Sequence, residues 1–179
     1  GDHRDLHLSL RRQRQMCIRD RITRSSNFGT NLLIDYLNAE DVNNTMKNIG
    51  AKNMKVLRGV GDLKAFDLGL SNTTTAADLL IIYEKLAMGK MVNNESSNRM
   101  IRILKDQVYN DIIPKYLPEK VVVAHKTGWI SGVRHDSGIV YVGNNEKYIL
   151  VLLSKNLEDD IEGADFLAKI SLEIYNFLS

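Results

Sequence analysis

Several residue types and patterns are scarce or missing in this chain, and each gap excludes a class of protein. The single cysteine, Cys17, excludes an internal disulfide, and together with the four histidines it forms no zinc-binding pattern. No apolar run approaches the roughly 18 residues that span a bilayer, and no basic start followed by an apolar stretch indicates a signal peptide. We therefore expect neither a metal site nor a membrane span.

The size and composition are those of an ordinary globular protein. A chain of 179 residues with 44% apolar and 26% charged residues is long enough and apolar enough for one domain with a hydrophobic core. The formal net charge is +2, but residues 1–21 alone carry +3 and residues 22–179 carry −1. The near-neutral body shows no basic footprint for nucleic acid and no basic amphipathic helix for a membrane surface.

The first 21 residues differ from the rest. They contain six arginines and no lysine, whereas residues 22–179 contain 13 lysines and five arginines. Their apolar residues show no clear helix or strand period, and residues 11–20 resemble translated sequencing-adapter read-through. The alternative is an arginine-rich targeting or nucleic-acid-binding arm. We favour the read-through and leave Cys17, His3 and His7 out of the functional argument, which divides the chain into a leader, 1–21, and a partial catalytic domain, 22–179.

The first half of the body has helical periods. The spacing predicts a short helix over 31–37, a second helix capped by Asp41 and ending near Gly50, and an extended segment over 54–57. Residues 58–73 form a long loop of the kind that is usually functional. Two further helices follow, one from a Thr74 or Thr75 cap to about Met88 and one over 96–107, with apolar stripes of Leu79, Ile82, Tyr83 and Leu86, and of Met100, Ile101, Leu104 and Val108.

The second half changes to a strand period. Residues 121–126, 138–142 and 147–153 are predicted strands, with a tight antiparallel hairpin at 143–146 between the last two. A final amphipathic helix over 161–178 would pack on the sheet through Leu167, Ile170, Ile174 and Phe177. The expected fold is α+β, with an antiparallel sheet covered by the C-terminal helix plus an all-helical subdomain.

Three features follow one another in a fixed order along the body. They are Ser25-Ser26-Asn27 before a helix, the loop that opens with Arg58, and His125-Lys126-Thr127-Gly128 at the end of a strand. This order resembles the class A β-lactamases and related penicillin-binding proteins, which carry Ser-x-x-Lys, Ser-Asp-Asn and Lys-Thr-Gly motifs. Ser26 replaces the central aspartate, and the Lys-Thr-Gly motif is unchanged. The resemblance covers nearly all of 22–179.

The resemblance implies roles for the matching residues. Lys126 and Thr127 would bind a substrate carboxylate, and Gly128 would let the substrate approach the strand without a side-chain clash. Ser25 would shuttle a proton to the leaving nitrogen, and Asn27 would hydrogen-bond the substrate amide. The resemblance implies no metal or organic cofactor, a monomer acting on a β-lactam or a cell-wall peptide, and a periplasmic or secreted location. Taken singly, Ser-x-Asn is also common as a helix-capping turn.

Five neighbouring side chains have open interpretations. Arg134 either helps to bind the substrate carboxylate or is an exposed loop arginine. For His135-Asp136 we favour a loop salt bridge or cap over an orienting pair, and we expect His125 to be a packed strand residue rather than a base. Trp129 either contacts the substrate or packs on neighbouring loops.

Two departures limit the resemblance. The chain contains no Ser-x-x-Lys, so we expect an N-terminally truncated domain without the acylating serine. Val60 stands where the family has the glutamate that activates the deacylating water. Asp62 and Asp67 lie nearby and are open as substitutes, although their spacing favours neither. Three functions stay open: a serine β-lactamase-like hydrolase, a related cell-wall peptide or ester hydrolase, and a non-catalytic module that binds a β-lactam or peptide.

Overall fold

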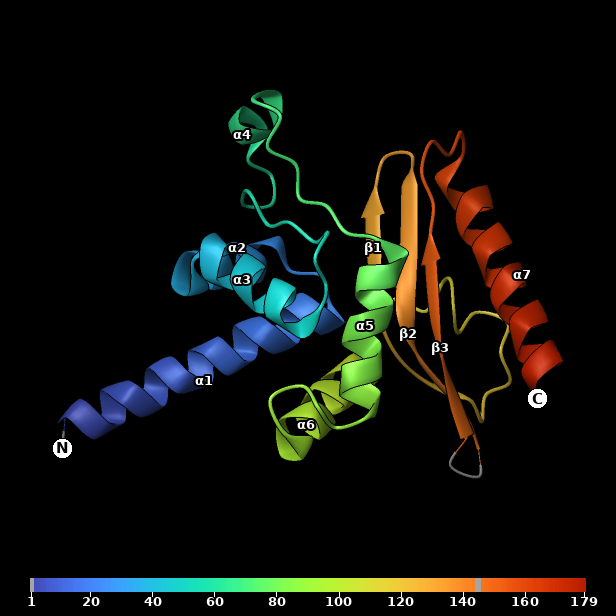
Figure 1. Cartoon of the computed structure of the whole chain (residues 1–179), viewed down its shortest axis with the longest axis horizontal. Helices are drawn as coiled ribbons and strands as arrows, with labels where there is room; N and C mark the ends of the chain where they lie inside the picture. The colour runs from blue at the N-terminus through green and yellow to red at the C-terminus, as the bar shows by residue number, and fades with distance from the viewer. Residues whose placement is uncertain (1, 144–145) are drawn as a thin grey trace. The chain divides into compact units, whose positions relative to one another are not determined.

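The computed structural model describes residues 2–143 and 146–179, with side chains from residue 10 onward. The chain forms two compact units, Gly1–Thr74 and Thr75–Ser179 (Figure 1), and each is described by itself. Within the described residues, no helix is both long and apolar enough to cross a bilayer.

Four helices make up the described part of the first unit: α1 (Asp2–Thr23), α2 (Asn27–Leu37), α3 (Ala39–Ile49) and α4 (Leu63–Asp67). The helix that we predicted over 31–37 begins four residues earlier. The second predicted helix ends as expected, because Gly50 adopts the left-handed conformation with φ 105°. Its cap is Asn38 and not Asp41, since the Asn38 side chain accepts from the Glu40 N–H at 3.1 Å.

The leader is helical throughout its described length. We saw no clear period in its apolar residues, yet α1 runs from Asp2 to Thr23 and packs on α2. Arginine, leucine, glutamine and methionine all have high helix propensity, so a helix forms here without an apolar stripe. That this segment is foreign to the protein stays a prediction.

The loop at 58–73 is less irregular than we predicted. It contains the five-residue helix α4, capped by Asp62, whose side chain accepts from the Ala65 N–H at 3.0 Å. The extended segment before it is limited to one antiparallel bridge between Lys55 and Thr73. This bridge closes the base of the loop.

The second unit is built in three layers around an antiparallel sheet. The sheet has the order β1 (Val122–Ile130), β2 (Val133–Gly143), β3 (Glu146–Leu153). Helix α7 (Asp160–Leu178) covers one face, and α5 (Ala76–Ala87) and α6 (Asn94–Lys105) cover the other (Figure 1). Thr75 caps α5 as predicted, accepting from the Asp78 N–H. The predicted α+β fold is confirmed.

All three strands are longer than predicted. β1 continues through the Lys-Thr-Gly motif to Ile130, and β2 begins at Val133, so only two residues separate them. The register pairs Lys126 with Ser137 and Trp129 with Arg134. The predicted turn between β2 and β3 includes residues 144–145, which lie outside the described residues.

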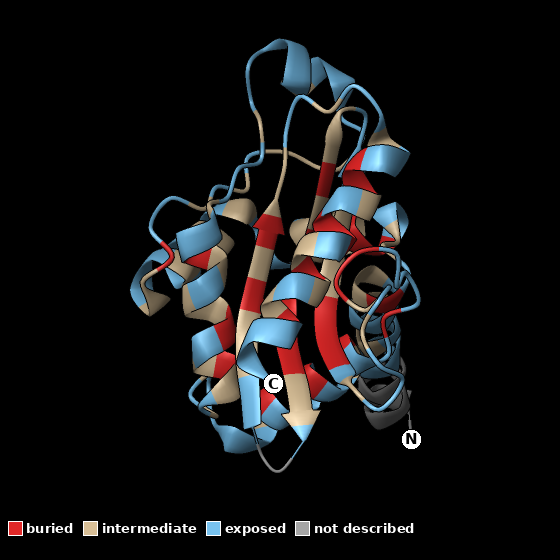
Figure 2. Ribbon diagram, turned by 90° about the vertical axis from the view of Figure 1, so that its right-hand side faces the viewer, coloured by how far each residue is buried: buried red, intermediate tan, exposed pale blue. Residues whose placement is uncertain are grey.

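The core lies between the sheet and α7, where buried residues line the strands and the inner side of the helix (Figure 2). Leu167 is buried, and Ile170 and Ile174 pack against the core as predicted. Phe177 is 88% exposed, so its predicted packing is wrong. Most buried residues of α7 are small, which lets the helix approach the sheet closely. The small ones are Gly163, Ala164, Ala168 and Ser171, and the two large ones are Leu167 and Tyr175.

The apolar stripe that we predicted on the second of the two central helices is only partly correct. Ile101 and Leu104 are buried, but Met100 is 37% exposed and Val108 is 52% exposed. The buried face of α6 instead includes Ser97, whose hydroxyl donates to the carbonyl of Asn93 at 2.8 Å. Ser97, and not Met100, therefore shares the buried face with Ile101 and Leu104, and its buried hydroxyl is hydrogen-bonded.

Candidate active site

The Ser25-Ser26-Asn27 segment forms the junction between α1 and α2. Ser26 is the N-cap of α2, and its hydroxyl accepts from the Gly29 N–H at 3.0 Å. Ser25 has φ 52°, in the left-handed region that non-glycine residues rarely adopt. Such strain costs about 1–3 kcal/mol and is concentrated at functional sites. The capping role is therefore filled by the middle residue, and not by Ser25 or Asn27.

One turn further along α2, Asn31 holds the loop that follows α3. Its side-chain amide accepts from the Val60 N–H at 2.7 Å and donates to the Val60 carbonyl at 3.0 Å. These two bonds reproduce the pairing that a neighbouring strand would give. Asn31 thereby fixes the backbone at the position where the family resemblance leads us to expect the deacylating glutamate.

Two more asparagines hold the same loop at its base. The Asn43 side chain bridges the N–H and carbonyl of Val56, at 2.7 and 2.8 Å. The Asn72 side chain accepts from the N–H groups of Leu57 and Arg58 and donates to the Arg58 carbonyl. Sequence reasoning missed all three asparagines, because each acts on a backbone group 13 to 29 residues away.

Neither aspartate of this loop has the buried position that a catalytic base would need. Asp62 caps α4 and is exposed, and Asp67 is exposed in the last turn of that helix. Val60, by contrast, is half-buried, and its backbone is held by the two hydrogen bonds with Asn31, which we call the Asn31 clamp. The loop therefore has its carboxylates on the surface and an apolar side chain at the held position.

The Lys-Thr-Gly motif lies inside β1, because the strand continues four residues beyond its predicted end at Lys126. Lys126, Thr127 and Gly128 are all half-buried, and the Lys126 ammonium donates to the Thr127 carbonyl at 2.6 Å. A Cβ added at Gly128 would meet the His135 side chain at 3.5 Å, an ordinary contact. Nothing in the packing on β2 therefore requires glycine at this position.

The motif also lies on an edge strand. Among the described residues, β1 pairs with β2 alone. An edge strand presents backbone N–H and carbonyl groups to any extended ligand that lies alongside it. A cation, a hydroxyl and a strand edge thus occur within three consecutive residues.

Arg134 is not an exposed loop residue. It lies in β2, is 9% exposed, and its guanidinium forms an ion pair with Asp111. It also stacks over the Trp129 ring at 5.3 Å from the centroid, while the indole N–H of Trp129 donates to Asp160 at 3.2 Å. Trp129 nevertheless remains 70% exposed. A carboxylate ligand of Arg134 would compete with Asp111, so its role in substrate binding stays a prediction.

His135 and Asp136 do not pair with each other. They are neighbours in β2, so their side chains point to opposite faces of the sheet, and the favoured loop salt bridge is wrong. His135 Nδ1 accepts from the Ser154 N–H at 3.1 Å, and burial lowers the pKa of its imidazole. Asp136 instead pairs with His125, whose Nδ1 lies 2.9 Å from Oδ1. His125 is a packed strand residue, as predicted.

Each half of the predicted site belongs to a different unit. Ser25 and Asn27 lie in the first unit, and Lys126, Thr127 and Gly128 lie in the second. Within each half, the predicted residues are sequence neighbours that lie on one short segment, the α1–α2 junction in the first unit and strand β1 in the second. Among the described residues, no cluster of three or more metal-binding side chains is present.

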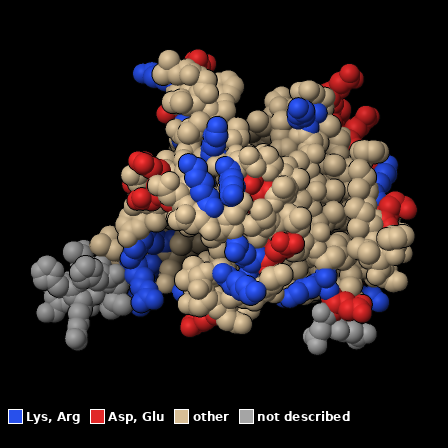
Figure 3. All heavy atoms as spheres, viewed as in Figure 1, with Lys and Arg blue, Asp and Glu red and all other residues tan. Residues whose placement is uncertain are grey.

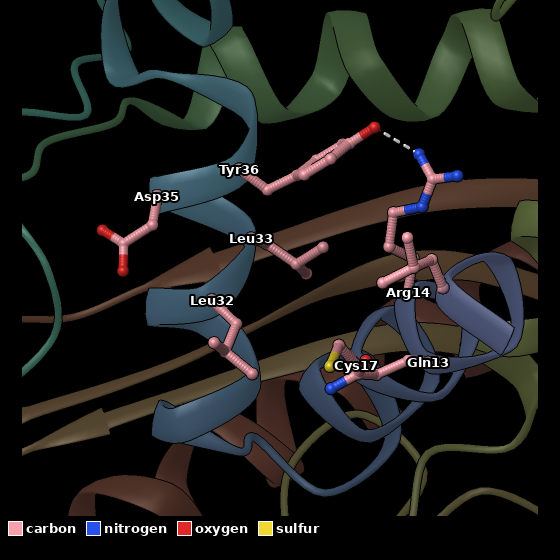
Figure 4. Close-up of a pocket in the computed structure, with 8 residues that line it drawn as sticks. Gln13, Arg14, Cys17, Leu32, Leu33, Asp35 and Tyr36 are labelled. Carbon is pink, nitrogen blue, oxygen red and sulfur yellow. Dashed lines mark hydrogen bonds between the residues drawn. The ribbon is translucent and has the colours of Figure 1, made fainter. Parts of the chain in front are cut away.

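A cavity of about 590 Å³ lies between α1 and α2 within the first unit (Figure 4). Leu32, Leu33 and Tyr36 line it from α2, and the Arg14 guanidinium from α1 donates to the Tyr36 hydroxyl. Its described lining contains none of the predicted site residues. On the face shown in Figure 3, basic and acidic side chains are interspersed.

Comparisons with known proteins identify the family of the chain. A family model described as the Beta-lactamase enzyme family matches residues 1–178. Beta-lactamase BRO-1 of Moraxella catarrhalis is 27% identical over 166 residues, which are 88% of this chain and 53% of that protein. The chain belongs to the β-lactamase enzyme family.

Solved structures show the same fold. PBP-A is 29% identical with a TM-score of 0.80, over 88% of this chain and 58% of that one. The TLA-1 extended-spectrum β-lactamase is 21% identical with a TM-score of 0.81, over 91% and 63% of the two chains. This chain therefore spans about half the length of the curated relative and about three-fifths of these structures.

Proposed function

We propose that this chain carries the substrate-binding and proton-transfer part of a serine β-lactamase-like hydrolase. The observation that supports this most is the unbroken Lys126-Thr127-Gly128 motif on an edge strand in a chain of the β-lactamase family. Lys126 supplies the cation for the substrate carboxylate, and Thr127 supplies a hydroxyl. The strand edge positions the substrate backbone through main-chain hydrogen bonds.

The other half of the proposed site supplies proton transfer. Ser25 passes a proton to the leaving nitrogen of the opened ring, and Asn27 hydrogen-bonds the substrate amide. The left-handed backbone of Ser25 supports this role, because strain of this kind is retained where function requires it. The complete reaction opens a β-lactam amide through an acyl-serine, which water then hydrolyses.

The acylating serine is not among these 179 residues, since no Ser-x-x-Lys occurs in them. The chain by itself therefore binds the substrate without a covalent step. In a protein that supplies the serine, Val60 leaves the held loop position without a carboxylate, so deacylation is slow. The solved acyl-enzyme of a PBP-A mutant with penicillin G supports a β-lactam as the substrate class.

The proposal is tested by measuring how the 179-residue chain binds benzylpenicillin and whether it hydrolyses a chromogenic cephalosporin. We expect reversible binding of benzylpenicillin by calorimetry, no mass shift in intact-protein mass spectrometry, and no turnover of the cephalosporin. Lys126→Met should weaken binding about tenfold or more, because a charge-assisted hydrogen bond is worth about 1.5–3 kcal/mol. Lys155→Met removes an exposed lysine of the same unit and is the matched control.

The other two functions predict different results. A cell-wall peptide or ester hydrolase would bind an acyl-D-Ala-D-Ala peptide more tightly than benzylpenicillin. A dedicated binding module would keep its non-covalent binding when a Ser-x-x-Lys segment of a relative is added in trans. Cephalosporin turnover in that mixture would support the hydrolase, and the absence of binding to either ligand would contradict all three.

We also propose that the protein acts outside the cytoplasm, as a monomer. The β-lactam and cell-wall substrates proposed for it occur there, and the family resemblance implies export. Light scattering of the purified chain tests the oligomeric state, and a stable dimer would contradict this part of the proposal.

A further inference from the structure

The side chain that precedes the Lys-Thr-Gly motif lies in a buried polar network. His125 is 1% exposed, and its Nδ1 lies 2.9 and 3.0 Å from the two oxygens of Asp136, which is fully buried. Asp136 also accepts from the Ile113 N–H at 3.0 Å. Because a carboxylate only accepts, His125 Nδ1 carries the proton of this contact.

The network extends from the sheet to the segment between α6 and β1 and to α7. His125 Nε2 lies 3.1 Å from the side-chain oxygen of Asn110. The Ser171 hydroxyl of α7 donates to the Ile113 carbonyl at 2.9 Å. The segment between α6 and β1, the strand itself and α7 are therefore joined through His125 and Asp136.

The neighbouring strand is built to accommodate the imidazole. Gly138 lies opposite His125 in the register. A Cβ at Gly138 would come within 2.6 Å of the His125 Cβ and 2.5 Å of the Ala124 carbonyl oxygen, both closer than real Cβ contacts. His125 is thus closely fitted in position as well as hydrogen-bonded.

A buried, hydrogen-bonded polar pair can do more than stabilise the fold. It can select one arrangement of the chain, because either partner left alone would be buried without its hydrogen bond. Here the fixed arrangement concerns an edge strand, which has a hydrogen-bonded neighbour on one side only among the described residues. The residues that follow His125 directly on this strand are Lys126 and Thr127.

We infer that His125, held by Asp136, is a positioning residue for Lys126 and Thr127. The pair fixes the twist and the height of β1 at residue 125, so that the ammonium and hydroxyl that follow are already placed when the substrate carboxylate arrives. This inference rests on the proposed function of the motif. His125 itself does not contact the substrate.

Two substitutions at His125 separate positioning from general stability. The amide nitrogen of asparagine lies as far from the backbone as Nδ1, so His125→Asn keeps a donor for Asp136 and loses the contact with Asn110. Glutamine is one bond longer, so His125→Gln keeps the Asn110 contact and loses the Asp136 bond. His135→Asn, on the adjacent strand, is the matched control.

Calorimetric titration with benzylpenicillin is the first measurement. We expect His125→Asn and His135→Asn to stay within about threefold of the unaltered chain, and His125→Gln to bind about tenfold more weakly, which corresponds to about 1.4 kcal/mol. Equal affinities for His125→Asn and His125→Gln would overturn the inference. If His125→Gln does not fold, Asp136→Asn takes its place with the same expected loss.

Amide hydrogen exchange of the ligand-free chain separates failure of this inference from failure of the proposed function. We expect Lys126 and Thr127 to exchange about tenfold faster in His125→Gln and to be unchanged in His125→Asn. If the unaltered chain does not bind benzylpenicillin but shows this pattern, the proposed function fails and the positioning role stands. Unchanged exchange in His125→Gln would overturn the role whatever the ligand result.

Discussion

The side-chain amide of Asn31 forms hydrogen bonds with both backbone groups of Val60, 29 residues away along the chain. We expect Asn31→Ala to release the loop at 58–73, because two part-buried hydrogen bonds are lost together, at about 1–2 kcal/mol. Amide hydrogen exchange measures this directly, and Val60 should lose protection first. Asn98→Ala, which removes an exposed bond to Asn94 in α6, should leave the loop unchanged. Equal protection of Val60 in both variants would contradict the clamp.

The two glycines on facing strands should differ in their tolerance of a methyl group. Gly138→Ala brings Cβ within 2.5 Å of the Ala124 carbonyl oxygen, so we expect it to lower the free energy of unfolding by about 2–3 kcal/mol. Gly128→Ala meets only an ordinary contact at 3.5 Å and should change stability by less than about 0.5 kcal/mol. Urea unfolding compares the two. A loss at Gly128 as large as that at Gly138 would be inconsistent with this packing.

The half-buried imidazole of His135 should make stability depend on pH. Burial lowers its pKa below the ordinary value of 6.5, so the folded state takes up a proton less readily than the unfolded state. Its contribution to stability is complete above pH 6.5 and falls as the pH drops through that value toward the lower folded-state pKa. Urea unfolding at pH 7.5 and 5.5 should show a smaller loss in His135→Asn than in the unaltered chain. An identical loss would contradict the assignment.

The exposed end of α7 should tolerate substitution, whereas its middle should not. Leu167 is 7% exposed in the core, and Leu167→Ala should lower the free energy of unfolding by about 2–5 kcal/mol. Phe177 is 88% exposed, and Phe177→Ala should change it by less than about 0.5 kcal/mol. Thermal unfolding of the two variants tests this difference. A large effect of Phe177→Ala would mean that this side chain is covered in solution.

Local signals were enough to predict most elements of the second unit. Thr75 precedes an apolar helical period, so the cap and the helix follow from side-chain chemistry and spacing. Strand ends were harder to predict, because we ended this strand at Lys126, just before Thr127-Gly128. An edge strand can carry a glycine without ending, and the strand continues to Ile130.

The contacts that shape the site depend on register and on long-range approach. His125 and Asp136 are 11 residues apart and meet only because the turn between Ile130 and Val133 is two residues long. Sequence reasoning left that turn unassigned and grouped Asp136 with its neighbour His135. The clamp on Val60 has even less local signal, since nothing near Asn31 in the sequence indicates its partner.

Because Ser26 is a helix cap, the middle position of the Ser-x-Asn motif need not be aspartate. Serine and aspartate are both favoured N-caps, so either satisfies the Gly29 N–H that the middle residue must meet. The family's aspartate and the serine found here are then equivalent as helix caps. The flanking serine and asparagine, by contrast, are the residues to which we assign proton transfer and substrate binding. A search pattern that demands aspartate in the middle would pass over chains of this type, and one that admits any good cap would find them.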